Sequence, residues 1–164
     1  MLVDGKLRNM ATIYIKSKGK ILLLDRIGSR VVKRSWCGVG GHFKAKEIND
    51  AKAAVLREMK EEIGLNERDL EHFNLRYIAL RPVKNELRIN YYFFADLKDG
   101  VKINQNCNEG VLEWVDIDKV NDRKMPYTAQ LVMKHYLETG INTEEFYSVT
   151  VDDHNVNIIS LGLS

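Results

Sequence analysis

The apolar positions along the chain fall into short runs that predict strands and two longer runs that predict helices. The strand-like runs are rich in β-branched and aromatic residues and are separated by polar or glycine-containing segments. They cover residues 10–15, 21–25, 74–80, 88–97, 110–115, 146–151 and 156–161. We expect turns between paired strands at 16–20, near Lys84 and Asn85, and at 152–155.

The two predicted helices cover residues 51–63 and 126–137. The first, AKAAVLREMKEEI, consists almost entirely of strong helix formers, with Asn49 or Asp50 as its N-cap and Gly64 in the usual place of a C′ glycine. The second repeats apolar residues at helical spacing. Strands interspersed with helices predict an α/β fold in which the helices pack on a sheet.

The segment between the second strand and the first helix has a different composition. Residues 27–35 are largely polar and predict a loop, and Trp36–Gly41 follows with three glycines among its last four residues. We expect Gly40 and Gly41 to lie on a loop before the helix. Glycines so concentrated indicate unusual backbone angles or a close approach of the backbone to something else.

Length and charge narrow the class of protein. A chain of 164 residues fits one domain, 1–164, and the formal net charge of +2, with scattered basic residues, indicates neither a nucleic-acid surface nor a membrane surface as partner. Two cysteines seventy residues apart form no disulfide framework, which predicts a cytoplasmic protein. We expect no signal peptide and no membrane span, and the pattern does not indicate an oligomeric state.

Three glutamates on the first helix carry the candidate chemistry. Glu58, Glu61 and Glu62 occupy positions i, i+3 and i+4, so their carboxylates share one face within an arc of about 100°. Like charges at this spacing repel one another, and clustered hard oxygen donors suit a hard cation such as Mg²⁺ or Mn²⁺. Alone, the triplet also fits a solvated acidic face. The glycines upstream favour a metal site, since a backbone carbonyl there can complete the metal shell.

The segment from Gly41 to Leu65 resembles the Nudix box, G-x5-E-x7-R-E-U-x-E-E-x-G-U, in which U is a bulky apolar residue. Here Gly41 is followed by five residues, Glu47, nine residues and then REMKEEIGL over 57–65. The resemblance implies a Nudix fold, which is an α/β/α sandwich around a mixed sheet. It also implies a hydrolase that cleaves phosphoric anhydrides in a small nucleotide with the help of Mg²⁺ or Mn²⁺.

Two departures from the box stand out. Nine residues rather than seven separate Glu47 from Arg57, and the standard spacing falls on Asn49, which is not acidic. We interpret this as a two-residue insertion before the helix, and it leaves open whether Glu47 is the usual structural partner of the box arginine. Val39 stands where many members have proline, which we expect to reduce rigidity rather than chemistry.

The resemblance also implies roles for the box residues. Glu61 and Glu62 become metal ligands, and Glu58 becomes either a further ligand or the general base. Arg57 orients the glutamates through charge-assisted hydrogen bonds. Gly41 offers its backbone carbonyl to a metal.

Features outside the box point to MutT-like members of the family. Trp36 introduces the glycines, and Glu109-Gly110 with Trp114-Val115 follow the helix, as in many of those proteins. Glu109 corresponds to a loop glutamate that adds a ligand or base, although it also fits a surface acid. The C-terminal helix and predicted hairpin lie within 126–161, and the terminal segment Glu145 to Leu161 resembles the extra hairpin of some members that act on oxidised purine nucleotides.

Basic residues near the predicted site are candidates for binding phosphates. They are Arg26, Lys33, Arg34 and Arg81, each of which also fits a surface charge. Residues 125–129 occupy the place where MutT-like enzymes recognise the purine. The acidic or amide pair that some oxidised-purine hydrolases use there is not evident, which weakens an assignment to 8-oxo-dGTP.

Three functions remain open at this point. The first is a MutT-type pyrophosphohydrolase of nucleoside triphosphates, including oxidised dNTPs. The second is hydrolysis of ADP-ribose or of a dinucleoside polyphosphate, and no residue pattern decides between these two. The third is a non-catalytic nucleotide sensor. Such proteins typically lose box glutamates, whereas Glu58, Glu61 and Glu62 are all present here.

Overall fold

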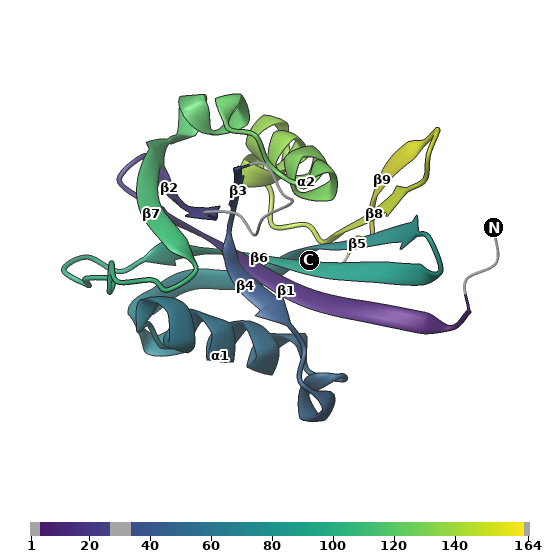
Figure 1. Cartoon of the computed structure of the whole chain (residues 1–164). Coiled ribbons are helices and arrows are strands. Elements are labelled where there is room, and N and C mark those ends of the chain that lie inside the picture. The colour runs from purple at the N-terminus through teal and green to yellow at the C-terminus, as the bar shows by residue number, and fades with distance from the viewer. Residues whose placement is uncertain (1–3, 27–33, 163–164) are drawn as a thin grey trace.

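The computed structural model describes residues 4–26 and 34–162, whose strands form one mixed sheet with a helix on each face (Figure 1). The strands are β1 (Lys6–Ser17), β2 (Lys20–Arg26), β3 (Ser35–Cys37), β4 (Val39–His42), β5 (Leu70–Val83), β6 (Glu86–Leu97), β7 (Gly110–Asp116), β8 (Tyr147–Val151) and β9 (Val156–Ser160). The helices are α1 (Ala51–Ile63) and α2 (Tyr127–Glu138), with short 3-10 turns at Ala45–Glu47, Glu67–Asp69, Ile117–Asp122 and Gly140–Asn142. The predicted α/β/α sandwich around a mixed sheet is confirmed.

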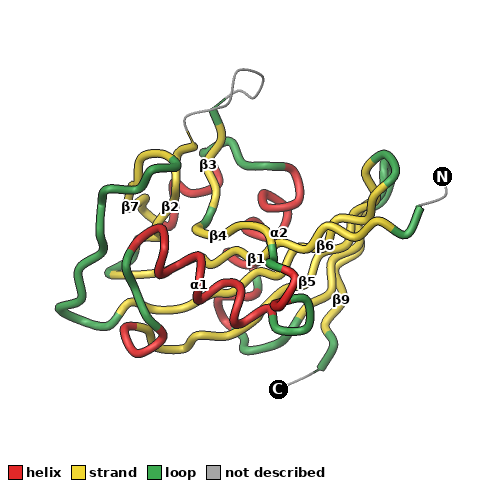
Figure 2. Tube along the Cα trace, turned by 60° about the horizontal axis from the view of Figure 1, so that its bottom comes forward, coloured by secondary structure: helices red, strands yellow, loops and turns green. Residues whose placement is uncertain are grey.

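The sheet combines parallel and antiparallel pairs. Its order is β3-β2-β1-β6-β5-β8-β9, while β4 pairs with β1 and β7 pairs with β2. The β1–β6 and β5–β8 pairs are parallel, and the remaining pairs are antiparallel. The long β5–β6 hairpin and the beginning of β1 extend together beyond the layer of helices (Figures 1 and 2).

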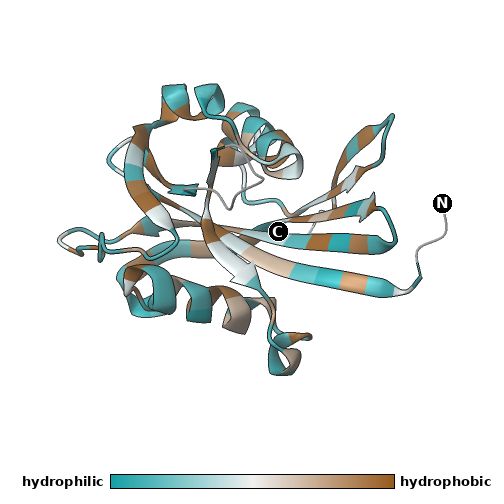
Figure 3. Cartoon of the chain, in the orientation of Figure 1, coloured by the Kyte–Doolittle hydropathy of each residue, from teal (hydrophilic) through white to brown (hydrophobic). Residues whose placement is uncertain are grey.

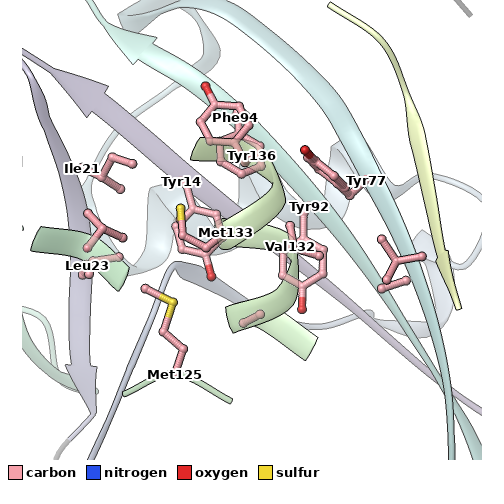
Figure 4. Close-up of a cluster of buried hydrophobic side chains, with 14 of the residues drawn as sticks. Tyr14, Ile21, Leu23, Tyr77, Tyr92, Phe94, Met125, Val132, Met133 and Tyr136 are labelled. Carbon is pink, nitrogen blue, oxygen red and sulfur yellow. The ribbon is translucent and has the colours of Figure 1, made fainter. Parts of the chain in front are cut away.

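Each face of the sheet buries its own hydrophobic core. Towards α1, the core includes Ile13, Phe93 and Met59. Towards α2, it includes Tyr14, Tyr92, Phe94 and Tyr136, which Figure 4 shows gathered between the strands and the helix. Four consecutive residues of β6, Tyr92, Phe93, Phe94 and Ala95, are therefore all buried, because a helix covers each side of the sheet. Beyond the helices, by contrast, brown and teal bands alternate along the β5–β6 hairpin (Figure 3).

Helix α1 begins and ends at the residues that the sequence predicts. The side chain of Asp50 accepts a hydrogen bond from the Ala53 amide at 2.9 Å, so Asp50 and not Asn49 is the N-cap. Gly64 adopts a left-handed conformation with φ of 73°, and its amide donates to the Lys60 carbonyl. Figure 2 shows α1 lying across its face of the sheet. The two caps fix which turns of the helix carry the glutamates.

The expected loop at Gly40 and Gly41 is wrong, because both residues belong to β4, which pairs with β1. Glycine has a low β propensity, so the local pattern did not indicate a strand. The expected close approach of the backbone is confirmed. A Cβ at Gly40 would lie 2.0 Å from the Ala11 carbonyl oxygen, and one at Gly38 would lie 2.6 Å from the Ile13 carbonyl oxygen. Only glycine fits these two positions without moving the backbone.

Other boundaries differ from the prediction by a few residues. Ser35, expected in a loop, begins β3, whereas Arg34 lies outside any helix or strand, as expected. Residues 27–33 of the predicted loop, including Lys33, lie outside the described residues. Helix α2 begins one residue later than expected, with Pro126 as its N-cap. The C-terminal hairpin is present, with Asp152 accepting from the amides of His154 and Asn155 at 2.7 Å each. Across the described part of the chain, the helices are too short or too polar to cross a membrane.

Candidate active site

Arg57 of α1 lies at the centre of a hydrogen-bonded cluster. Its Nε and Nη2 donate to the two carboxylate oxygens of Glu47 at 2.6 and 3.0 Å. Its Nη1 donates to Glu58 at 2.7 Å and to Glu61 at 3.1 Å, and Nη2 also donates to the His42 carbonyl at 3.1 Å. One guanidinium therefore joins two of the helix glutamates to Glu47 and to the end of β4. This geometry supports the orienting role that the sequence suggests for Arg57.

The two-residue insertion does not separate Glu47 from Arg57. A 3-10 turn at Ala45–Glu47 places the Glu47 carboxylate against the guanidinium, and the same carboxylate accepts from the Lys44 amide at 2.8 Å. The hydrogen bonds from Arg57 lower the pKa of Glu47 to about 2. The extra residues lie between this turn and α1, and Glu47 is the partner of the box arginine.

Replacing Glu47 by glutamine tests the structural part of this cluster. The Glu47 side chain is 5% exposed and that of Arg57 is 16% exposed, so the variant leaves a desolvated guanidinium with weaker partners. We expect the free energy of unfolding in urea to fall by about 1.5–3 kcal/mol, the range for hydrogen bonds to charged groups. Glu113→Gln, which removes the more exposed pair with Arg123, is the control and should change it by less than about 1 kcal/mol. Equal effects of the two variants would contradict a special role for Glu47.

Glu62 differs from the other helix glutamates in being buried. It is 8% exposed, and neither of its carboxylate oxygens has a hydrogen-bond partner among the described residues. Burial, followed by the negative charges of Glu109 and Glu58, raises its pKa to about 8. A buried carboxylate without a partner is costly, and such a group in a folded protein calls for a ligand or a function.

Glu58 lies directly against Gly41 of β4. A Cβ placed on Gly41 would be 2.7 Å from the nearer Glu58 carboxylate oxygen, so glycine at this position leaves room for that carboxylate. The Glu58 side chain is 13% exposed, whereas Glu61 is 53% exposed and also lies 3.4 Å from the Lys44 ammonium. The three acids thus form a gradient from buried to exposed along one face of α1.

These residues fit a divalent cation by their chemistry. The orphaned oxygens of Glu62 and the carboxylate that fills the space at Gly41 are hard donors within one turn of helix. Over residues 4–26 and 34–162, no three acidic, histidine or cysteine side chains converge as a ready ligand set. Glu58 and Glu61 instead direct their carboxylates at Arg57.

Arg26 of β2 lies beside Gly40 and the acidic side chains. Its Nη2 lies 3.2 Å from the Gly40 carbonyl oxygen and 3.2 Å from a carboxylate oxygen of Glu109, in the loop before β7. Glu109 is one of the charges that raise the pKa of Glu62. The structure therefore brings Arg26, Gly41, Glu109 and the helix glutamates into one region.

A pocket of about 260 Å³ opens on the α2 face of the sheet. Arg26 and Arg81 line it, together with Gly40 and residues 126–129 at the start of α2, the segment that the sequence associates with purine recognition. Arg34 is placed differently. It pairs with the buried carboxylate of Asp25, lies over the ring of Trp36, and does not line this pocket.

Several residues lining the pocket were not among the sequence candidates. Arg8 and Thr12 come from β1, and Arg88 and Asn90 come from β6. Their positions alternate along each strand, so they share a face, but only the β1–β6 pairing shows that the two faces coincide. Without that pairing, alternation alone could not have distinguished this face from the opposite one.

Cys37 also lines the pocket, and its environment argues against a nucleophile. Burial raises the pKa of the thiol to about 11, so little thiolate is present near neutral pH. Its Sγ lies 3.6 Å from the Leu24 carbonyl oxygen. Both Cys37 and Cys107 are free thiols. This environment fits a packing role for Cys37.

Comparison with known proteins finds a family and a set of similar structures. A model of the NUDIX domain matches residues 6–137, which leaves β8 and β9 beyond the match. A MutT protein from Bacillus halodurans superimposes with a TM-score of 0.69 at 20% sequence identity, covering 92% of this chain and 97% of its own. A MutT protein from Methanosarcina mazei gives 0.65 at 19% identity, covering 86% and 99%.

A structure whose name includes a substrate is also similar. An Ap4A hydrolase from C. elegans superimposes with a TM-score of 0.63 at 17% identity, covering 84% of this chain and 99% of its own. At these identities the likeness concerns the fold. It does not separate one substrate from another.

Proposed function

Because the chain belongs to the NUDIX domain family, we propose that it is a Mg²⁺-dependent hydrolase that cleaves the diphosphate of a nucleoside diphosphate-linked substrate, with nucleoside triphosphates as the first class. The family comprises hydrolases that use a divalent metal and act on small nucleotides. One observation carries the proposal for this chain. Glu109 pairs with Arg26, the charges of both act on the buried carboxylate of Glu62, and Arg26 lines a pocket large enough for part of a nucleotide.

Each residue then has a role that follows from its position. Glu58, Glu61 and Glu62, with the carbonyl of Gly41, would hold Mg²⁺ or Mn²⁺, which supplies charge neutralisation and an acidified water when bound. Arg57 holds Glu58 and Glu61 in place. Glu58 or Glu109 accepts the proton of the attacking water. Arg26 contacts a phosphate, since its guanidinium is at the boundary between the glutamates and the pocket.

The alternative substrates are ADP-ribose and dinucleoside polyphosphates. The structural similarity to an Ap4A hydrolase favours keeping the second of these in the comparison. A non-catalytic sensor is the weakest candidate, because all three helix glutamates are present and the buried Glu62 carboxylate has no hydrogen-bond partner in the part of the chain that the structure describes.

The test is a substrate panel with controlled metal. Purified protein is incubated with dNTPs, 8-oxo-dGTP, ADP-ribose and dinucleoside polyphosphates, and release of phosphate, pyrophosphate or nucleoside monophosphate is followed. We expect turnover of at least one nucleotide with Mg²⁺ and a loss of at least about 100-fold when EDTA removes the metal, with recovery on adding Mg²⁺ or Mn²⁺. Equal turnover in EDTA, or no hydrolysis across the panel, would refute the proposal.

A further inference from the structure

Three arginines form a single row across the floor of the pocket. Arg8 of β1 and Arg88 of β6 are partners in the parallel register, and Arg88 and Arg81 of β5 are partners in the antiparallel register. Directly paired positions project to the same face of a sheet. All three side chains line the pocket, at the end of the sheet where β1 begins and the β5–β6 hairpin turns (Figure 1).

The row carries more positive charge than its neighbours neutralise. Glu86 is shared between Arg88, at 2.8 Å, and Arg8, at 3.6 Å. Arg81 lies over the ring of Tyr127 at 5.0 Å and has no carboxylate partner among the described residues. Like charges at paired positions of a sheet are destabilising, so a row of three arginines with one carboxylate indicates an anionic ligand.

The glutamate end of the site is the region of Gly40, Gly41 and the helix glutamates. Between it and the row of arginines, the pocket is lined by uncharged side chains. Thr12 is level with Gly40, and Met10 and Asn90 form the step between that level and the arginines. Arg8 and Thr12 are four residue steps apart on β1, so about 13 Å separates the two ends at the rise of a β-strand. A thioether and an amide in between suit a nucleoside better than a continuous run of phosphates.

A buried hydroxyl supports a polar ligand in the same pocket. Tyr14 lines it and is fully buried, and its hydroxyl has no hydrogen-bond partner among the described residues. Buried hydroxyls without a partner are uncommon, and a bound ligand can supply one.

We propose that this row, Arg8–Arg88–Arg81, binds a second phosphoryl group, carried on the nucleoside of the substrate about one nucleoside unit from the scissile diphosphate. The inference rests on the proposed function, since it takes the glutamate end as the position of the diphosphate. The substrate class is then a nucleoside diphosphate derivative that is also phosphorylated on its ribose. Specificity would come from the charge of that group, which three guanidinium groups recognise.

Binding of product-like nucleotides to the full-length protein tests this. Isothermal titration with Mg²⁺ present compares AMP, adenosine 2′,5′-bisphosphate, adenosine 3′,5′-bisphosphate and GMP. We expect one of the bisphosphates to bind at least tenfold more tightly than AMP. The ratio of the AMP dissociation constant to that of the bisphosphate should decrease when NaCl is raised from 50 to 500 mM, because salt screens the contact. In Arg88→Gln the ratio should approach one. This variant leaves Glu86 its second partner, Arg8, which protects the fold.

Arg68→Gln is the matched control, because it removes the same charge from an exposed position outside the pocket. It should keep the wild-type ratio. Equal affinities for AMP and both bisphosphates, or no binding of either bisphosphate, would overturn the inference. So would a preference for GMP that Arg88→Gln abolishes, since the row would then recognise a purine edge. Metal-dependent turnover in the substrate panel with any of these results would leave the proposed function standing.

Discussion

Glu62→Gln is expected to lower kcat by about 10²–10³-fold, the loss typical of removing one preorganised electrostatic group from an active site. The carboxylate that this variant removes is the most buried of the three on α1 and has both oxygens free of hydrogen bonds among the described residues. Glutamine keeps the shape of the side chain but cannot supply the negative charge that a divalent cation requires. Steady-state kinetics at saturating Mg²⁺ measures the change.

The same variant is expected to stabilise the metal-free protein at high pH. The pKa of Glu62 is raised to about 8, so between pH 4.5 and 8 the folded state keeps a proton that the unfolded state releases. The free energy of unfolding of the wild type in EDTA should therefore fall as pH rises through this window. Glu62→Gln lacks this decline, and at pH 9 it should be more stable than the wild type by about 2–4 kcal/mol.

Urea denaturation at pH 5, 7 and 9 in EDTA separates the two roles of Glu62. At pH 5 the two proteins should be of nearly equal stability, and the difference should grow with pH. A variant that is less stable at every pH would show that Glu62 is a structural residue with partners of its own. A variant that is stable but fully active would remove Glu62 from the metal site.

The sequence predicts the local features of this fold well and the non-local ones poorly. The limits of α1 follow from Asp50 and Gly64, whose side-chain and backbone properties act within one turn. Strand β4 depends on pairing with β1, about thirty residues earlier in the chain, and its glycines carry no strand propensity. Strand β5 begins at Leu70, four residues before the predicted start. The sequence did not indicate these residues as strand, because a positive φ at His72 and shifts of register interrupt the alternation of the strand.

For the candidate site, too, the sequence predicts the local features and misses the non-local ones. Helical spacing places Glu58, Glu61 and Glu62 on one face, but it does not show that Glu62 is buried beside Glu109 while Glu61 is half exposed. Proximity in the chain also made Arg34 a candidate for phosphate binding. Arg34, which directly precedes β3, instead pairs with Asp25 of β2. Which charges meet depends on strand order, and strand order is not encoded in any single segment.

Glu61→Gln is expected to reduce turnover by about 10²–10³-fold while leaving the fold nearly unchanged. Its carboxylate is 53% exposed and lies 3.4 Å from the Lys44 ammonium and 3.1 Å from Arg57, contacts that contribute at most about 1 kcal/mol at an exposed site. Arg57 keeps Glu47 and Glu58 as partners in the variant. Since stability should hardly change, a loss of activity must come from the missing charge at the metal.

Glu67→Gln is the matched control, because Glu67 is 51% exposed and pairs with Lys52 at 2.6 Å in the turn that follows α1. Both variants lose one exposed carboxylate with a lysine partner, so the expected change in thermal midpoint is small for each. Only Glu61→Gln should also weaken Mg²⁺ activation, seen as a higher metal concentration for half-maximal rate. If Glu61→Gln retained full turnover and the wild-type Mg²⁺ dependence, three carboxylates on one helical face would not be enough to define the metal site, and Glu58, Glu62 and Glu109 would have to form it without Glu61.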